Sequence, residues 1–192
     1  MQQVTKKYLS ISINMDGMDK LINHFLRAFA LSLFLFITFA GMAVATPSAP
    51  GFTSVALDGK SVASAQLGGK PYIVNFFASW CPPCRAEIPD MVALQSKYGA
   101  KGFTFIGVAI NETVPSMRAF ITKNKINYPV LMVDDKLIGA FNTLVDGGVR
   151  AIPTSFVVNS SGKVTQVITG ARSKEYLEQI ISELLRKPVV SK

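Results

Sequence analysis

Short runs of apolar residues alternate with amphipathic segments between residue 70 and the end of the chain. Two of these runs, YIVNFFA and FTFIGVAI, are rich in residues that favour β-structure, so both are predicted to be buried central strands. The predicted strands are 72–78, 103–110, 128–133, 155–159 and 163–169. The last two are expected to form a hairpin across Ser160-Ser161-Gly162. A shorter extended piece around 52–57 precedes a turn at Asp58-Gly59.

The segments between these runs have the periodicity of amphipathic helices. The predicted helices are 83–98, 114–125, 135–142 and 173–187. Taken together, the elements follow the order β-α-β-α-β-α-β-β-α. This order predicts an α/β fold in which helices cover both faces of a central sheet.

The spacing of apolar residues also predicts which side of each helix faces the core. The inward side of helix 83–98 is predicted to consist of Ile88, Met91, Val92 and Gln95, and of helix 114–125, Met117, Phe120 and Ile121. For helix 173–187 the inward residues are Tyr176, Leu177, Ile180, Ile181 and Leu184. Pro89 is expected to kink the first of these helices, and Ser173 is expected to be the N-cap of the last.

The amino-terminal part of the chain has a different pattern. Residues 28–45 contain no charged side chain, follow Lys20, His24 and Arg27, and end in Ala43-Val44-Ala45. A basic flank, an apolar stretch and an A-x-A ending predict a signal peptide cleaved after Ala45. An uncleaved membrane anchor is the alternative, because about 18 apolar residues reach the lower limit of a membrane span. We therefore expect residues 1–45 to be a signal peptide or anchor, and 46–192 to be the folded domain.

Composition and charge narrow the classes of function. The chain of 192 residues is 49% hydrophobic and 17% charged, which is typical of a packed domain. Of its 20 basic and 12 acidic residues, four and two lie in 1–45, so 46–192 carries 16 and 10 and a net charge of +6. The longest basic run has two residues, which favours a solvated surface over a nucleic-acid site. The single histidine also lies in 1–45, so the domain has none.

Both cysteines of the chain, Cys81 and Cys84, lie in the sequence FASWCPPCRAEIP. Zinc needs about four ligands, and the domain offers two cysteines and no histidine. Arg85 follows the pair where covalent haem attachment needs a histidine, and copper would need a third soft or imidazole ligand. A static disulfide over so short a ring would stabilise little. The pair is therefore predicted to be a redox-active dithiol that works without a metal or other cofactor.

The position of the pair suits this chemistry. Cys81 follows a predicted strand and precedes a helix, whose amino terminus stabilises a thiolate. Cys81 is then the attacking thiol, and Cys84, one turn further on, resolves the mixed disulfide. Trp80 either offers an apolar docking surface beside the pair or is an ordinary core tryptophan.

Two motifs together, FASWCPPCRAEIP and IPTSFVVNSSGKV, resemble the thioredoxin-like thiol-disulfide oxidoreductases. The resemblance spans about residues 47–187 and implies a mixed central sheet flanked by helices. It also implies that Pro153 is cis and faces the cysteines. Ile152 and Thr154, with Trp80, Pro82 and Pro83, would line a groove in which a substrate segment pairs with the backbone.

Within that family the sequence is most similar to the exported TlpA/ResA/DsbE-like branch, which is linked to cytochrome c maturation. Residues 103–133 resemble the β-α insert of this branch. An acidic residue of the insert lies near the redox pair in the branch, and Glu112 stands at that place. Glu112 is either a buried group that shuttles protons and tunes the thiols, or a solvated loop residue.

The first helix and the link before Pro153 each carry one further feature. Glu87 is predicted to be a surface residue of the first helix. The link 142–150 is longer than is usual in the branch, and its two glycines predict a mobile loop beside the active site.

The residues between the cysteines predict the direction of electron flow. Pro82 and Pro83 carry no charge and have no N–H to donate to a thiolate, so we expect a reducing pair. Such a reductant needs a membrane thiol-disulfide electron donor, and its substrate would be a disulfide in an exported partner such as apocytochrome c. The alternatives are a disulfide oxidase or isomerase, and a non-catalytic binding module on the same fold. A peroxidase of this fold would use a cysteine outside a C-x-x-C motif.

Overall fold

The computed structural model describes residues 22–27, 29 and 46–186, and the chain divides into two units, Met1–Ala45 and Thr46–Lys192. In the first unit, residues 22–27 and 29 are helical. Among the described residues, no helix has the length and apolar character needed to cross a membrane. The apolar stretch 28–45, apart from Phe29, lies outside the described residues, so the prediction of a signal peptide or anchor is unaffected.

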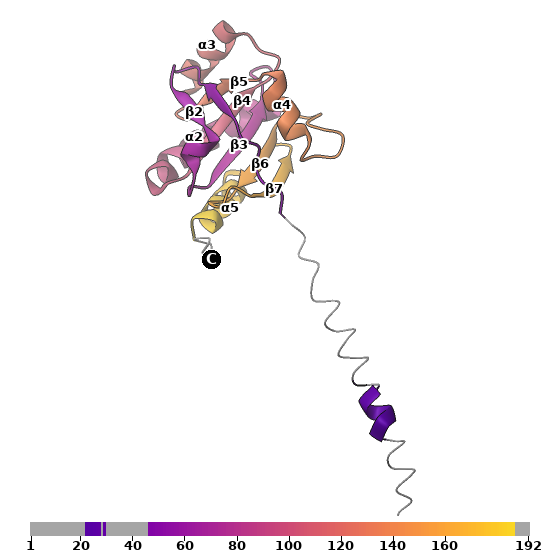
Figure 1. Ribbon diagram of the computed structural model, residues 1–192. Helices are drawn as coiled ribbons and strands as arrows, with labels where there is room; N and C mark the ends of the chain where they lie inside the picture. Colours follow the sequence, from indigo (N-terminus) through magenta and orange to yellow (C-terminus); the bar gives the residue numbers. More distant parts are fainter. Residues whose placement is uncertain (1–21, 28, 30–45, 187–192) are drawn as a thin grey trace, which may run out of the picture. The chain divides into compact units, whose positions relative to one another are not determined.

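The second unit is built on a five-stranded mixed sheet with the order β5-β4-β3-β6-β7 (Figure 1). The strands are β3 (Tyr72–Phe77), β4 (Thr104–Ala109), β5 (Val130–Met132), β6 (Thr154–Val158) and β7 (Val164–Thr169). The central strand β3 pairs in parallel with β4 and antiparallel with β6. All five predicted strands are therefore confirmed, with small differences at their ends. Residues 103–133, predicted as an insert, supply the two strands on one side of β3.

Helices cover both faces of this sheet, as predicted. They are α2 (Pro82–Tyr98), α3 (Val114–Asn124), α4 (Asp135–Asn142) and α5 (Lys174–Arg186). Apolar side chains of α2, α3 and α5 pack on one face, against strand residues such as Ile73 and Phe105. On the other face, Phe141 of α4 packs edge-to-face against Phe76 and Phe156. The central strand is buried on both sides, because a layer of side chains covers each face.

A small hairpin and the start of the domain complete the second unit. Strands β1 (Thr53–Val55) and β2 (Ser61–Ala63) pair antiparallel, and a short 3-10 helix η1 (Ser64–Leu67) follows them. The strand β2 and the helix η1 were not predicted. Pro47 and Ala49 form backbone hydrogen bonds with Val164 and Gly162 at the beginning of β7. The domain is therefore anchored to its sheet from the second residue after Ala45.

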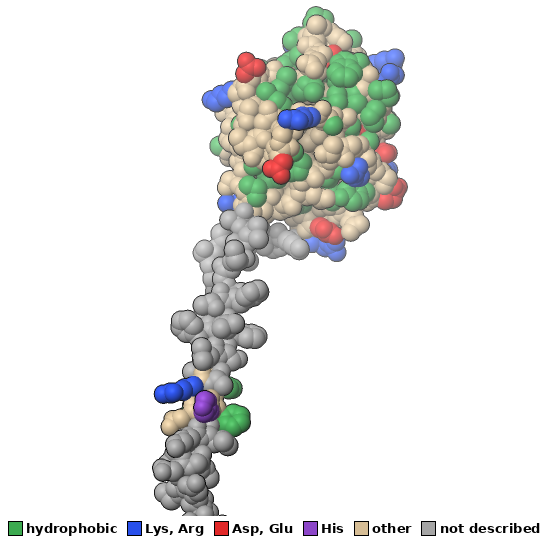
Figure 2. Space-filling view, turned by 90° about the vertical axis from the view of Figure 1, so that its right-hand side faces the viewer, with side chains coloured by type: hydrophobic (Ala, Val, Ile, Leu, Met, Phe, Trp, Pro, Cys, Tyr) green, Lys and Arg blue, Asp and Glu red, His purple; other side chains and the backbone are tan. Residues whose placement is uncertain are grey.

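The predicted core positions are confirmed except for one residue of α5. Tyr176 was expected to face the core, but it is 37% exposed and its hydroxyl accepts a hydrogen bond from Gln166. The phenol hydroxyl needs a polar partner, and Tyr176 finds one at the surface, which explains the difference. On the face shown in Figure 2, charged side chains of the described residues are scattered singly, so this face has no continuous basic patch.

Candidate active site at the amino terminus of α2

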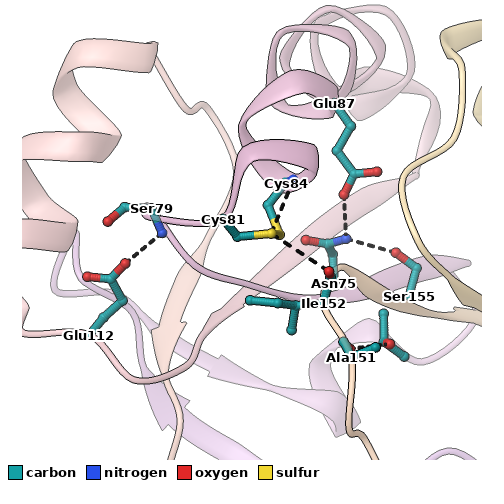
Figure 3. The surroundings of a disulfide bond; sticks show 10 residues. Asn75, Ser79, Cys81, Cys84, Glu87, Glu112, Ala151, Ile152 and Ser155 are labelled. Atoms are coloured by element: carbon teal, nitrogen blue, oxygen red, sulfur yellow. Dashed lines mark hydrogen bonds between the residues drawn. A yellow bond between two sulfur atoms is a disulfide. The ribbon is translucent and has the colours of Figure 1, made fainter.

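The two cysteines lie where β3 gives way to α2, and they form a disulfide (Figure 3). Cys81 is the N-cap of the helix, and its sulfur accepts a hydrogen bond from the backbone N–H of Cys84 at 3.4 Å. On its other side, Cys81 Sγ lies 3.7 Å from the carbonyl oxygen of Ile152. Cys84 is fully buried, whereas Cys81 is 4% exposed. Cys81 is therefore the sulfur nearer to solvent, as the predicted attacking thiol must be.

Pro82 and Pro83 form the first turn of α2, and both are exposed. Prolines fit this turn because its N–H groups would have no partner within the helix. As the sequence indicated, they donate no hydrogen bond to the Cys81 sulfur, and its backbone donor is Cys84. Pro89 also lies inside α2, which runs without interruption from Pro82 to Tyr98.

Trp80 is not a core residue. Its side chain is 56% exposed, and the indole N–H donates to the backbone carbonyl of Asn111 at 3.3 Å. A large apolar ring held at the surface beside Cys81 offers a docking area for a partner. This exposure excludes the alternative in which Trp80 is ordinary core packing.

The Ile152–Pro153 peptide bond is cis, as the resemblance implied. Pro153 and Thr154 are buried, and the Thr154 hydroxyl donates to the carbonyl oxygen of Ala151 at 2.7 Å. The carbonyl oxygen of Pro153 accepts from the N–H of Gly170 at 2.8 Å. These bonds fix the segment that carries the Ile152 carbonyl against Cys81.

The environment of Glu112 is intermediate between the buried group and the solvated loop residue that the sequence left open. Its side chain is half-buried, and one carboxylate oxygen accepts from the backbone N–H of Ser79 at 2.6 Å. Figure 3 shows this contact on the opposite side of Cys81 from Asn75. Together with the bond from Trp80 to Asn111, it fastens the segment before Cys81 to the loop before α3. Glu112 is thus a fixed part of the site and not a freely solvated residue.

Glu87 is buried, so its prediction as a surface residue was wrong. It is 5% exposed, and its carboxylate accepts a hydrogen bond from the Asn75 side chain at 3.0 Å. Burial raises the pKa of Glu87 to about 7, while the bond from Asn75 and the nearby Arg172 partly oppose this rise. Cys84, Glu87, Ile88 and Met91 follow the i, i+3, i+4, i+7 spacing of one helix face. That spacing is the signal that would have placed Glu87 inside.

Asn75 is the second site residue that sequence reasoning missed. It is the polar residue of a strand whose six side chains are all buried, and it lies opposite Ser155 in the antiparallel pairing of β3 with β6. Its amide donates to both Glu87 and the Ser155 hydroxyl, at 3.0 and 2.9 Å. A buried amide must find such partners, so an asparagine within an apolar run was itself the signal.

The loop 142–150 is closed by its own hydrogen bonds. The Asn142 side chain accepts from the N–H of Val149 at 2.8 Å, and the N–H of Gly148 donates to Val145. Gly147 and Gly148 both have positive φ, so they serve the tight turn of this loop. The two glycines that suggested mobility therefore have a defined structural use.

The arrangement supports thiol-disulfide exchange. Cys81 is positioned to attack, Cys84 to resolve, and Glu87 has a pKa near neutrality one helical turn beyond Cys84. Within 46–186 and the short described helix, no three His, Cys, Asp or Glu side chains form a group that would hold a metal ion.

Residues 44–184 match the Redoxin family. The thiol-disulfide oxidoreductase ResA of Bacillus thuringiensis (strain Al Hakam) is 34% identical over 137 residues, which are 71% of this chain and 76% of that protein. ResA of Bacillus subtilis (strain 168) is 27% identical over 135 residues, covering 70% and 72%.

Solved structures agree with the sequence relatives. A thiol:disulfide interchange protein of the thioredoxin family from Chlorobium tepidum TLS is 50% identical, with a TM-score of 0.72 over 74% of this chain and 98% of that chain. A putative DsbE from Chlorobium tepidum is 34% identical, with a TM-score of 0.63 over 73% and 96%. Both therefore share this fold over nearly their whole length.

Proposed function

The chain belongs to the redoxin family, in its TlpA/ResA/DsbE-like branch of thiol-disulfide oxidoreductases, and we propose that it is exported and reduces disulfides of exported partner proteins. The observation that carries the proposal is the environment of the Cys81 sulfur. It has one backbone N–H donor, at 3.4 Å, and the Ile152 carbonyl oxygen on its other side, at 3.7 Å.

The reaction is an exchange in two steps. The Cys81 thiolate attacks one sulfur of the partner disulfide, a mixed disulfide forms, and the other partner sulfur leaves as a thiolate. Cys84 then loses its proton and attacks Cys81 Sγ. The partner sulfur that was bonded to Cys81 leaves as a thiolate, and the Cys81–Cys84 disulfide forms. Two electrons and two protons pass from the protein to the partner.

Three features of the site favour the reducing direction. A strong oxidant needs a heavily stabilised thiolate in its reduced form. Here the first turn of α2 begins with two prolines, which donate no hydrogen bond, and a carbonyl oxygen faces the sulfur. The buried Glu87 disfavours a second negative charge nearby once its own carboxyl is ionised. Each feature makes the thiolate less stable and the dithiol more reducing.

The proposed reducing role requires an electron donor and a disulfide substrate. A reductant in an oxidising compartment must itself be reduced again, and a membrane thiol-disulfide electron donor would do this. The haem-binding cysteines of apocytochrome c, once oxidised to a disulfide, are the substrate that the branch suggests. The exposed Trp80 and the groove at Ile152, Pro153 and Thr154 would receive the partner segment.

The first test is the midpoint potential of Cys81–Cys84 in the full-length protein, equilibrated against thiol-disulfide buffers. A value near or below about −250 mV, in the range of thioredoxin, is expected. A value near about −120 mV, typical of strong oxidants, would overturn the reducing role and indicate a disulfide-forming enzyme instead.

A second test separates catalysis from mere binding. Cys84→Ala removes the resolving thiol, so Cys81 should remain joined to partner proteins as mixed disulfides that reducing agents release. The matched variant Cys81→Ala should trap none. Equal results for the two variants would favour a non-catalytic binding module.

A further inference from the structure

Three exposed arginines lie on chain segments that border the redox pair. Arg85 follows Cys84, Arg150 precedes the Ala151–Pro153 segment, and Arg172 lies in the loop between β7 and α5. The domain has five arginines and eleven lysines. Arginine differs from lysine because its planar guanidinium binds a carboxylate through two parallel hydrogen bonds. Three of the five arginines therefore lie on segments that border one site.

Arg150 is held in position by the loop 142–150. Its Nε donates to the carbonyl oxygen of Gly147 at 2.6 Å. A Cβ at Gly147 would lie only 3.1 Å from Arg150 Cζ, so the loop leaves just enough room for the guanidinium. Two residues further along, the Ile152 carbonyl oxygen contacts Cys81 Sγ. Arg150 is thus two residues away from the carbonyl group that contacts the sulfur.

Arg172 is held by contacts within its own loop, between β7 and α5. Its Nη1 donates to the carbonyl oxygens of Gly170 and Ala171, at 3.2 and 3.0 Å. The N–H of Gly170 donates to the carbonyl oxygen of Pro153, so this loop is bonded directly to the cis proline. Arg172 also lies within 5.8 Å of the Tyr176 ring centre, in a cation–π contact. Its guanidinium is therefore ordered before any partner arrives.

Acidic residues near the site compensate this positive charge only in part, since Arg172 lies near the Glu87 carboxylate and opposes the rise of its pKa. The carboxylate of Glu87 is buried and bonded to Asn75, and that of Glu112 is bonded to the Ser79 N–H. Asp146 is exposed in the loop 142–150. Across the described residues the ion pairs are Lys60–Asp58 and Lys97–Glu178, so none involves an arginine.

We propose that Arg150 and Arg172, with Arg85, select partner segments that carry acidic side chains beside the disulfide cysteine. This inference rests on the proposed function and adds the chemistry of the substrate to it. Ordered guanidinium groups lose little side-chain entropy on binding a carboxylate, and charge at the rim of a site mainly speeds association. The partner is thus an acidic, cysteine-containing segment that enters over Ile152 and Pro153.

The test compares three synthetic peptides that lack tryptophan and differ only beside an internal disulfide, with Glu, Gln or Lys at the flanking positions. The reduced full-length protein is mixed with each peptide, and its oxidation is followed by fluorescence of its single tryptophan, Trp80. The Glu peptide should react about tenfold faster than the Lys peptide at low salt, with the Gln peptide between them. The difference should shrink at high salt, where exposed charges are screened.

Variants assign the preference to the arginines. Arg150→Gln should slow the Glu peptide and leave the Gln peptide unchanged, and adding Arg172→Gln should slow the Glu peptide further. Arg150→Lys should retain part of the preference, because it keeps the charge and loses the planar fork. The control Arg186→Gln removes the same charge at the far end of α5 and should change nothing.

A neutral small disulfide, bis(2-hydroxyethyl) disulfide, distinguishes the proposed reducing function from the proposed preference for acidic segments. If wild type and Arg150→Gln reduce it equally while the preference for the Glu peptide is weaker in the variant, the inference stands. Equal rates for the three peptides would overturn the inference and leave the proposed function intact. Failure to reduce any disulfide, including the neutral one, would overturn the proposed function itself.

Discussion

The carboxyl group of Glu87 changes its charge state near neutral pH. Its pKa is raised from the ordinary 4.5 to about 7, chiefly by burial. Between these two values the folded protein holds a proton that the unfolded chain has released. The resulting stabilisation is complete below about pH 4.5 and is lost as the pH rises through 7.

We expect Glu87→Gln to remove this dependence on pH. A shift of this size corresponds to about 3 kcal/mol, so the wild-type free energy of unfolding should fall by about that amount between pH 4.5 and 8. The glutamine should stay neutral and still accept the bond from Asn75, which makes the variant the more stable protein at pH 8. Urea unfolding of both oxidised proteins across this range is the measurement. Parallel curves for the two proteins would contradict the assignment, and the exposed Glu183→Gln is the control.

Glu112 should act through the backbone of Ser79. Glu112→Ala removes the acceptor of a 2.6 Å hydrogen bond, and losing a bond to a charged group typically costs about 1.5–3 kcal/mol. The Trp80 ring, fastened beside it, should gain freedom, which lowers the anisotropy of its fluorescence. Glu112→Gln keeps an acceptor oxygen and should preserve most of both properties. Unchanged stability and anisotropy in the alanine variant would show that the contact is not used in solution.

At the scale of elements, two glycines predict opposite responses to the same substitution. Gly107 lies in the buried strand β4, where a Cβ would stand 2.9 Å from Phe77 Cε1 and 3.3 Å from Val130 Cγ2. Gly107→Ala should therefore destabilise the fold by about 1–3 kcal/mol through overpacking.

Gly139 provides the contrast, because it lies in α4 with open space around the position that a Cβ would take, out to 4 Å. Gly139→Ala should stabilise the protein by about 0.5–1 kcal/mol, since alanine loses less backbone freedom in a helix. Urea midpoints of both variants test the pair. The same sign of change in both would contradict this account of the packing.

The elements with strong periodicity were predictable, and the irregular ones were not. The runs YIVNFFA and FTFIGVAI became β3 and β4 almost residue for residue. Residues 61–67 escaped prediction because SVASAQL has one large buried side chain, Val62, and no repeating pattern. Short pieces of this kind are held by their contacts with the sheet, which a local pattern does not contain.

The candidate site shows the same limit. Cys81, Cys84 and Pro153 were predictable because a motif carries them. Glu87 and Asn75 satisfy each other inside the protein, and a polar residue considered alone is expected at the surface. Their pairing depends on the packing of α2 against β3. This tertiary contact cannot be predicted from either segment alone.

At the scale of the whole molecule, the first contacts of the domain are compatible with removal of the amino-terminal segment. Pro47 and Ala49 are bonded to β7, so cleavage after Ala45 would leave every described contact of the domain in place. We expect the exported protein to begin at Thr46, as determined by intact mass and amino-terminal sequencing. An intact mass that still includes residues 28–45, in a protein that requires detergent, would favour the membrane anchor.

The hydrogen bond from the Cys84 N–H to Cys81 Sγ makes a redox sulfur the cap of a helix. A thiolate is a better acceptor than a disulfide sulfur, so the cap strengthens when the pair is reduced and Cys81 is ionised. The first turn of α2 should therefore open less often in the reduced protein, and the Cys84 amide should exchange its proton with solvent more slowly. The exchange rate of this single backbone N–H, measured by nuclear magnetic resonance, should therefore report the oxidation state of the pair without an attached probe.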